Sequence, residues 1–261
     1  MIERATTLAA VAALGLPANT RVDRRIPKKL LIEQGAPTSA DKRRIQDGVE
    51  DLLWIAALKP TNIGISAFYG ADDEVEREYL EIAVLTATLR TQAKTTRLIE
   101  LIHRAIPYPV VLFSESETPD EPSVVLSLAH KRRAKNEPGK MVIEELHKSE
   151  LYSESLSRLA LSSLPASNLL SMYQGLIDRV MALESARITG IYVPPDSEER
   201  SKAMWLGLNA HANLTRELAL LRAQAAKEKQ INRRIELNLQ IKRLEADLSA
   251  HTDALRTSSD S

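Results

Sequence analysis

The chain has 261 residues, of which 44% are hydrophobic and 27% charged, enough for a sizeable core. Its 35 basic and 35 acidic residues cancel, so no global field favours nucleic acid or an anionic membrane, and any basic surface must be local. The absence of cysteine excludes disulfides, a thiol nucleophile and cysteine-ligated metals, and agrees with a cytoplasmic location. No run approaches the roughly 20 apolar residues of a membrane span, so we expect no membrane contact.

The N-terminal part is predicted to contain three helices. The first covers Glu3–Leu14 and ends at Gly15, and a short second one covers Lys28–Gln34. Thr38 or Ser39 can cap a third, longer helix that runs to about Leu58. Its apolar residues recur at spacings of three and four, which predicts one core-facing side.

The middle of the chain carries the strongest strand signals. Tyr79–Leu89 is apolar on both alternating faces except for Glu81 and several threonines, which predicts a central strand covered on both sides. A helix at Lys94–Arg104 follows. Val110–Phe113 and Val124–Leu128 then predict two strands paired as a hairpin.

After Gly139 the pattern becomes helical. Leu214 to about Leu255 shows apolar residues at coiled-coil spacing, with an interruption at AKEKQINRR and a polar residue, Asn238, in the expected seam. The seam is expected to include Ile231, Ile235 and Leu255, and its partner-binding residues to be Leu237, Ile241, Leu244 and Leu248. Its partner could be the preceding helix, a second copy of the chain, or another protein.

The predicted fold class is therefore α+β. A mixed sheet flanked by helices forms an N-terminal domain at residues 1–150, a helical region covers 151–212, a coiled coil covers 213–256, and 257–261 form a disordered tail.

The first candidate site is a pair of His/basic clusters that flank the predicted hairpin. His103 and Arg104 precede it, and His130, Lys131 and Arg132 end it. Together they could bind phosphate or act in acid/base chemistry; the alternative is a structural histidine beside a solvated basic strand end.

A metal-dependent nuclease is the second candidate. Its site needs converging carboxylates and usually a lysine, which Glu81, Lys131, and Glu50 and Asp51 on the long helix could supply. The spacing matches no nuclease signature, and a local ion pair with a neighbouring Lys or Arg explains Glu81 more simply. We therefore predict no cofactor and no metal, and the sequence leaves open whether the protein is an enzyme.

The third candidate is a nucleic-acid surface made of two basic clusters on neighbouring short helices, which faintly suggest a helix-turn-helix. Its residues are Arg24, Arg25, Lys28, Lys29, Arg43 and Arg44. The alternative is a solvated charged face.

Several blocks resemble the bacterial family known as domain of unknown function 4391. They include RVDRRIPKKLLIEQG at Arg21–Gly35, EYLEIAVL at Glu78–Leu85, LIHRAIPYPVVL at Leu101–Leu112, LSLAHKR at Leu126–Arg132 and KEKQINRRIELNLQIKRLEA at Lys227–Ala246. The resemblance implies a DNA-associated accessory role beside helicase-like and methylase-like proteins in bacterial anti-phage defence. We therefore expect a non-enzymatic adaptor that docks onto a larger partner through the coiled coil, with self-association or direct DNA contact as further possibilities.

Overall fold

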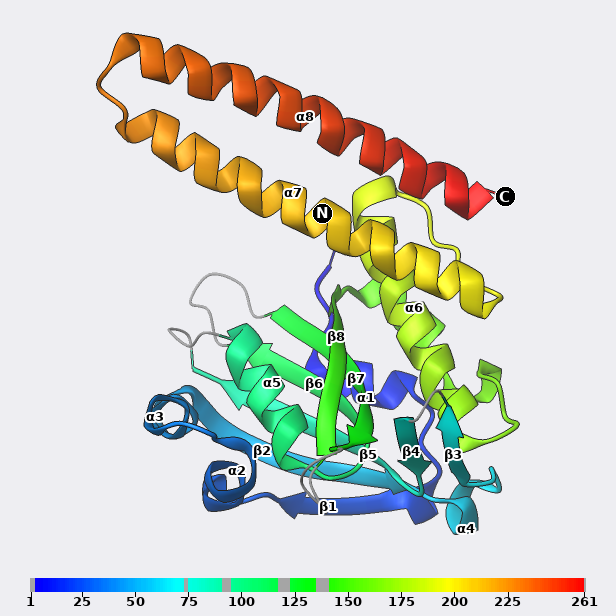
Figure 1. Cartoon of the computed structure of the whole chain (residues 1–261). Helices are drawn as coiled ribbons and strands as arrows, with labels where there is room; N and C mark the ends of the chain where they lie inside the picture. Colours follow the sequence, from blue (N-terminus) through cyan, green and yellow to red (C-terminus); the bar gives the residue numbers. More distant parts are fainter. Residues whose placement is uncertain (1–2, 73–74, 91–94, 117–122, 135–140, 261) are drawn as a thin grey trace. The chain divides into compact units, whose positions relative to one another are not determined.

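The computed structural model describes residues 3–72, 75–90, 95–116, 123–134 and 141–260 (Figure 1). The chain forms two compact units, Met1–Val180 and Met181–Ser261. The division falls inside one helix, not at the expected boundaries after residues 150 and 212. The fold class is α+β, as predicted.

A six-stranded sheet forms the centre of the first unit, in the order β1-β2-β5-β6-β7-β8. The strands are β1 (Arg21–Arg25), β2 (Val49–Leu58), β5 (Ile82–Leu89), β6 (Val110–Ser116), β7 (Ser123–Arg133) and β8 (Met141–Leu151). Only β5 and β6 pair in parallel, and all other neighbours are antiparallel. A separate two-stranded sheet joins β3 (Phe68–Asp72) to β4 (Val75–Tyr79).

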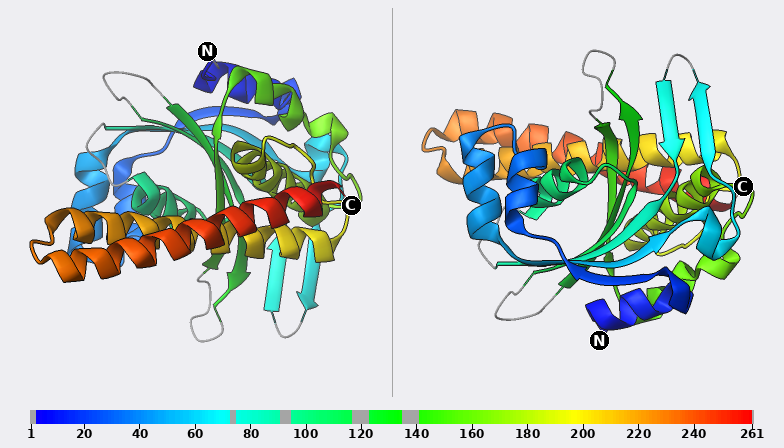
Figure 2. Two further views of the ribbon diagram at one scale, coloured as in Figure 1. Left: turned by 90° about the horizontal axis from the view of Figure 1, so that it is seen from above. Right: turned by 90° about the horizontal axis from the view of Figure 1, so that it is seen from below.

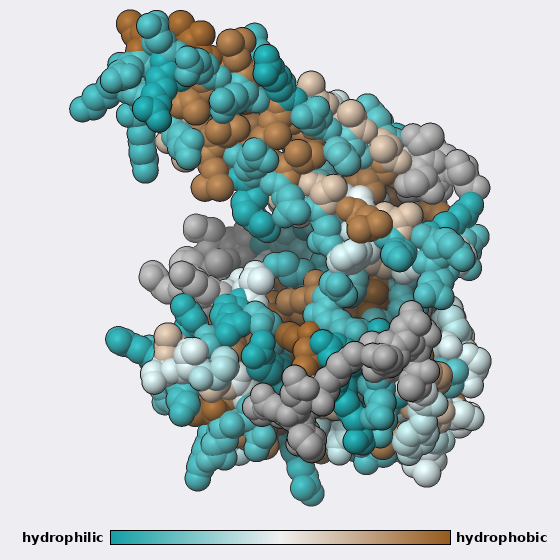
Figure 3. Space-filling model, viewed as in Figure 1, coloured by the Kyte–Doolittle hydropathy of each residue, from teal (hydrophilic) through white to brown (hydrophobic). Residues whose placement is uncertain are grey.

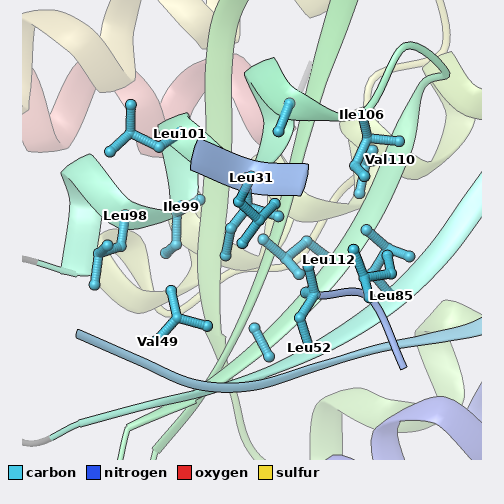
Figure 4. Packing of buried hydrophobic residues seen from close by; sticks show 14 of the residues in the cluster. Leu31, Val49, Leu52, Leu85, Leu98, Ile99, Leu101, Ile106, Val110 and Leu112 are labelled. Atoms are coloured by element: carbon cyan, nitrogen blue, oxygen red, sulfur yellow. The ribbon is translucent and has the colours of Figure 1, made fainter. Parts of the chain in front are cut away.

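The parallel pair requires a crossover, because parallel strands cannot be joined by a tight turn. Helix α5 (Thr95–Ala105) lies in this connection and packs on the sheet. Helices α2 (Lys28–Gly35) and α3 (Ser39–Gly48) pack against α5 on the same face (Figure 2). A cluster of buried hydrophobic residues lies beneath these helices (Figure 4). It includes Leu31, Val49, Leu52, Leu85, Leu98, Ile99, Leu101, Ile106, Val110 and Leu112.

The opposite face of the sheet is buried as well. Successive strand residues point to opposite faces, so Val111 and Phe113 of β6, both fully buried, lie on the side away from Val110 and Leu112. Helix α1 (Thr7–Ala13) and the first part of α6 (Leu169–Thr189) supply cover there. Short 3-10 segments complete the first unit, at Ala18–Thr20, Ser153–Leu159 and Leu161–Ser163, together with helix α4 (Pro60–Ile63).

The prediction of one long helix at residues 39–58 is wrong for its second half. Helix α3 ends at Gly48, whose carbonyl oxygen accepts a hydrogen bond from Arg90 N at 2.9 Å, and the chain continues as β2. The apolar spacing was compatible with a helix, but pairing with both β1 and β5 stabilises the extended form.

The expected change to helix after Gly139 is also wrong, because β8 follows. Its charged residues Glu144, Glu145, Lys148 and Glu150 obscure the strand pattern, which an edge strand tolerates because water reaches it. The predicted β6–β7 hairpin is confirmed.

The second unit contains the end of α6 and two long helices, α7 (Glu198–Lys227) and α8 (Ile231–Asp260), which pack along each other as a helical hairpin. Helix α8 continues past residue 256, where the disordered tail was expected to begin. No helix among the described residues is long and apolar enough to cross a membrane.

The close contact between α2 and α5 gives a first prediction. A Cβ atom at Gly35 would lie 2.6 Å from Leu101 O and 2.8 Å from Ala105 Cβ. Gly35→Ala should therefore push the helices apart and lower the free energy of unfolding by about 1–3 kcal/mol. Urea unfolding measures this change, and Gln34→Ala on the exposed side of α2 is the control. Equal stability of both variants would contradict the close approach.

Candidate functional site

His130 lies in a polar cluster between β7, β4 and α6. Its Nδ1 atom is hydrogen-bonded to the Tyr79 hydroxyl, and its Nε2 atom lies 2.7 Å from Gln174 Oε1. The Gln174 amide nitrogen in turn donates to Asp178 Oδ1 at 2.8 Å. Four side chains from three elements thus form one continuous chain of hydrogen bonds.

The direction of each hydrogen bond follows from Asp178, because an ionised carboxylate only accepts. Asp178 orients the Gln174 amide so that its oxygen faces His130, and His130 must therefore carry its proton on Nε2. Its Nδ1 is then the acceptor for the Tyr79 hydroxyl. Burial lowers the pKa of His130 and raises that of Tyr79, so both side chains are neutral near pH 7.

Tyr173 extends this cluster into the sheet. Its hydroxyl accepts from Ala129 N at 3.0 Å and donates to Val110 O at 2.8 Å, and burial raises its pKa. Neither buried phenol can therefore act as a base at neutral pH. The cluster connects the β3–β4 sheet and α6 to β7, and Tyr79 and Tyr173 are completely buried.

On the other face of β7, His103 of α5 and Lys131 of β7 lie buried between the helix and the sheet. His103 Nε2 is 3.0 Å from Ser127 Oγ, and the Lys131 amine donates to the carbonyl oxygens of Ile106 and Tyr108. Burial lowers the pKa of both side chains, and the nearby Lys131 lowers that of His103 further. His103 and His130 are thus on opposite faces of the sheet and do not form the single site considered from the sequence.

The residues considered for a nuclease have separate partners. Glu81 pairs with Lys59 at 3.0 Å, as the structural alternative predicted. Glu50 pairs with Arg90 at 2.9 Å and Asp51 with Arg25 at 2.5 Å, both from β2 and not from a helix. Among the described residues no group of three His, Cys, Asp or Glu could hold a metal ion.

The six basic residues predicted to contact nucleic acid lie on β1, α2 and α3, and most have acidic or carbonyl partners. Arg25 pairs with Asp51, Lys29 with Glu33, Arg43 with Asp47 and Arg44 with Asp41, while Lys28 donates to Gln46 O and Arg24 is exposed. A pocket of about 320 Å³ beside them is lined by residues of both signs, including Lys28 and Glu50. This surface has no excess of positive charge at the pocket.

The α7–α8 hairpin encloses an apolar seam. The four expected partner-binding residues, Leu237, Ile241, Leu244 and Leu248, are half-buried along α8 at heptad spacing. Three of the four buried residues of α7, Met204, Leu218 and Ala225, are fourteen and seven positions apart, which are multiples of the heptad. Leu255 lies against Gly207, and Arg222 pairs with Glu245 at 2.7 Å. The seam predicted from the sequence therefore has its partner within the same chain.

A second apolar row lies on the outer side of α8. Ile231, Ile235 and Leu239 are 67%, 52% and 54% exposed, and their spacing of four places them on one face. At 100° per residue this face is opposite the seam. Ile231 and Ile235 were expected in the seam, and the structure places them outside it. Figure 3 shows apolar side chains at the surface of the hairpin.

One family model matches the chain, and the match extends over parts of both compact units. The family described as Domain of unknown function (DUF4391) matches residues 14–248. The chain belongs to this family. The DUF4391 match includes both compact units almost completely, so the hairpin is part of what the family shares. No curated protein and no solved structure matches the chain.

Sequence reasoning missed Tyr79, Gln174 and the outer row as parts of these sites. Tyr79 and Gln174 are 51 and 44 residues from His130 along the chain, and no local sequence pattern predicts contacts over such separations. The outer row did have a signal, because aliphatic residues at both 231/235/239 and 237/241/244 give α8 two apolar faces in this DUF4391 chain.

The buried histidines predict acid sensitivity. Burial, and then the neighbouring His130, lower the pKa of His147 to about 4, whereas an unfolded histidine titrates near 6.5. The unfolded state therefore binds more protons below pH 6.5, and the stability from neutral His147 is lost as the pH falls from 6.5 towards 4. Urea unfolding should show that the free energy of unfolding falls by about 1–3 kcal/mol over this pH range, and that it falls by less in His147→Gln. The control is His251→Gln at an exposed position. If the unfolding free energy depends on pH in His147→Gln as it does in the wild type, His147 is not the source of the acid sensitivity.

A second stability prediction concerns Asp41, which is only 2% exposed and accepts from Arg97 at 2.8 and 3.1 Å and from Arg44 at 2.9 Å. The Arg97 guanidinium holds the pKa of this carboxyl well below its usual range. Its stabilisation is therefore present at neutral pH and is lost as the pH falls below about 4. Asp41→Asn should cost about 2–3 kcal/mol at pH 7 in chemical denaturation.

The control for this experiment is Asp47→Asn, which removes the exposed pair with Arg43 and should cost less than about 1 kcal/mol. Similar losses in the two variants would mean that the Asp41–Arg97 pair between α3 and α5 stabilises the fold no more than an exposed ion pair does.

Proposed function

We propose that this protein is a non-enzymatic adaptor subunit of a bacterial DNA-associated complex of the anti-phage defence type, in which a helicase or methylase is the larger partner. The adaptor docks through its C-terminal coiled coil, the α7–α8 hairpin, and works in the cytoplasm. The association with DNA and defence rests on the family resemblance and not on geometry.

The observation that carries the docking role is the outer aliphatic row of α8. Three large aliphatic side chains on one exposed helix face are costly to leave in water, since burial of each contributes about 1.5–3 kcal/mol. The seam needs none of them, because its own residues already pack on α7. A face of this kind is typical of a helix that binds a partner.

The first unit supports a role without catalysis. His130 is hydrogen-bonded to Tyr79 and Gln174, Lys131 to backbone carbonyl oxygens, and the carboxylates considered for metal binding pair with Lys59, Arg90 and Arg25. These pairs explain the charged residues as parts of the fold. The unit then serves as the folded body that carries the hairpin.

An affinity pull-down from the native host, with and without nuclease treatment, tests the proposal. Wild-type protein should recover a helicase or methylase that survives nuclease. Leu244→Asp combined with Leu248→Asp should lose that partner, because two charges in the seam separate α7 from α8. Circular dichroism should show the accompanying loss of helix.

The matched control is Ser249→Asp, which adds a charge to an exposed position of the same helix and should retain the partner. Capture that depends on nucleic acid, or that persists after the hairpin has opened, would refute docking through the hairpin.

A further inference from the structure

Basic side chains surround the outer row of α8 at the distal end of the hairpin. Residues 227–243 contain six Lys or Arg and two Glu, an excess of four positive charges in a chain that is neutral as a whole. By helical geometry Lys242 lies on the same face as Ile235, with Arg234 and Arg243 on its two flanks. By the same geometry Glu236 lies beside Arg243, so the apolar row has a border with more cations than carboxylates.

Within the part of the chain that the structure describes, no carboxylate lies within ion-pair distance of Arg234, Lys242 or Arg243. Arg233, by contrast, pairs with Glu228 at 3.7 Å. The charges that border the row are thus available to a partner.

We propose that the outer face of α8, formed by Ile231, Ile235 and Leu239 and bordered by Arg234, Lys242 and Arg243, docks into an apolar groove with an acidic rim on the larger protein partner. This inference rests on the proposed adaptor function and identifies the face and the chemistry of its partner. The aliphatic side chains fill the groove, and the cations oppose carboxylates at its edges.

Charge argues against a second copy as the occupant. Two such faces brought together would place one positively charged helix end against another, and like charges across an interface oppose association.

The same face is less suited to binding a membrane or nucleic acid than to binding a protein groove. An interfacial membrane helix has an apolar side along its whole length, whereas this face becomes polar after Leu239, at Lys242, Ser249 and Asp253. Phosphate contacts would use the cations but would leave the exposed aliphatic row in water.

The absence of cysteine allows a site-specific test on the full-length protein. In Ile235→Cys the new thiol is unique and can carry a benzophenone maleimide photo-crosslinker. Ser249→Cys is the matched control, because it lies fourteen residues further along, on the same face where no aliphatic row exists. Both labelled proteins are irradiated in native-host lysate after nuclease treatment, and the crosslinked peptides are sequenced.

The expected result is a crosslink from residue 235, and not from 249, to an apolar segment of the helicase or methylase that has Asp or Glu nearby. Arg234→Glu combined with Lys242→Glu should lower the crosslink yield about tenfold or more, a typical effect of reversing close interface charges. Changing the facing acids of the partner to Lys should restore it.

Other outcomes overturn the inference. They are a crosslink to a second copy, a partner segment without acidic residues, or Ile235-dependent binding to phosphatidylglycerol vesicles or to a short DNA duplex. If Ile235→Asp still captures the partner while the seam variant does not, the adaptor function stands and this face is wrong. If the wild-type protein captures neither helicase nor methylase, the adaptor function itself fails.

Discussion

Burial of the parallel pair β5–β6 on both faces is the constraint on which the first unit depends. A parallel pair needs a crossover, and the crossover helix α5 must lie on one face of the sheet. Helices α2 and α3 then pack on α5, and Asp41 connects α3 to Arg97 of α5. The second face needs its own cover, which α1 and the first part of α6 provide. The order of helices and strands follows from this requirement.

Two-sided burial also explains why so many polar groups lie inside the protein. The chain must leave α5 and enter β6 through Ile106–Pro109, where carbonyl oxygens would otherwise lack donors. Lys131 satisfies two of them from beneath. On the opposite face, Tyr173 bonds to the backbone at Val110 and Ala129 without interrupting the sheet. Lys131, which the sequence suggested as part of a catalytic set, therefore serves the hydrogen bonding of buried backbone.

The sequence predicted those features of the fold that depend on local patterns. The α+β class, the central strand near Glu81, the β6–β7 hairpin and the family itself are confirmed. Val49–Leu58 was misassigned because its spacing fits either a helix or a strand, and only pairing with β1 and β5 decides between them. The hydrogen-bonded chain from Tyr79 to Asp178 could not be predicted, because His130 bonds to residues that are 51 and 44 positions away from it along the chain. The seam was located correctly at Leu237, Ile241, Leu244 and Leu248, but the break at Glu228–Gln230 concealed which neighbouring aliphatic residues face outward.

The two apolar faces of α8 have different consequences for sequence change over evolutionary time. Substitutions in the seam alter the stability of the hairpin, so they are restricted by folding. Substitutions at 231, 235 and 239 change side chains that lie opposite the seam, and they leave its packing intact. Related proteins can therefore vary this outer surface, and with it the molecules they recognise, while they retain one common hairpin.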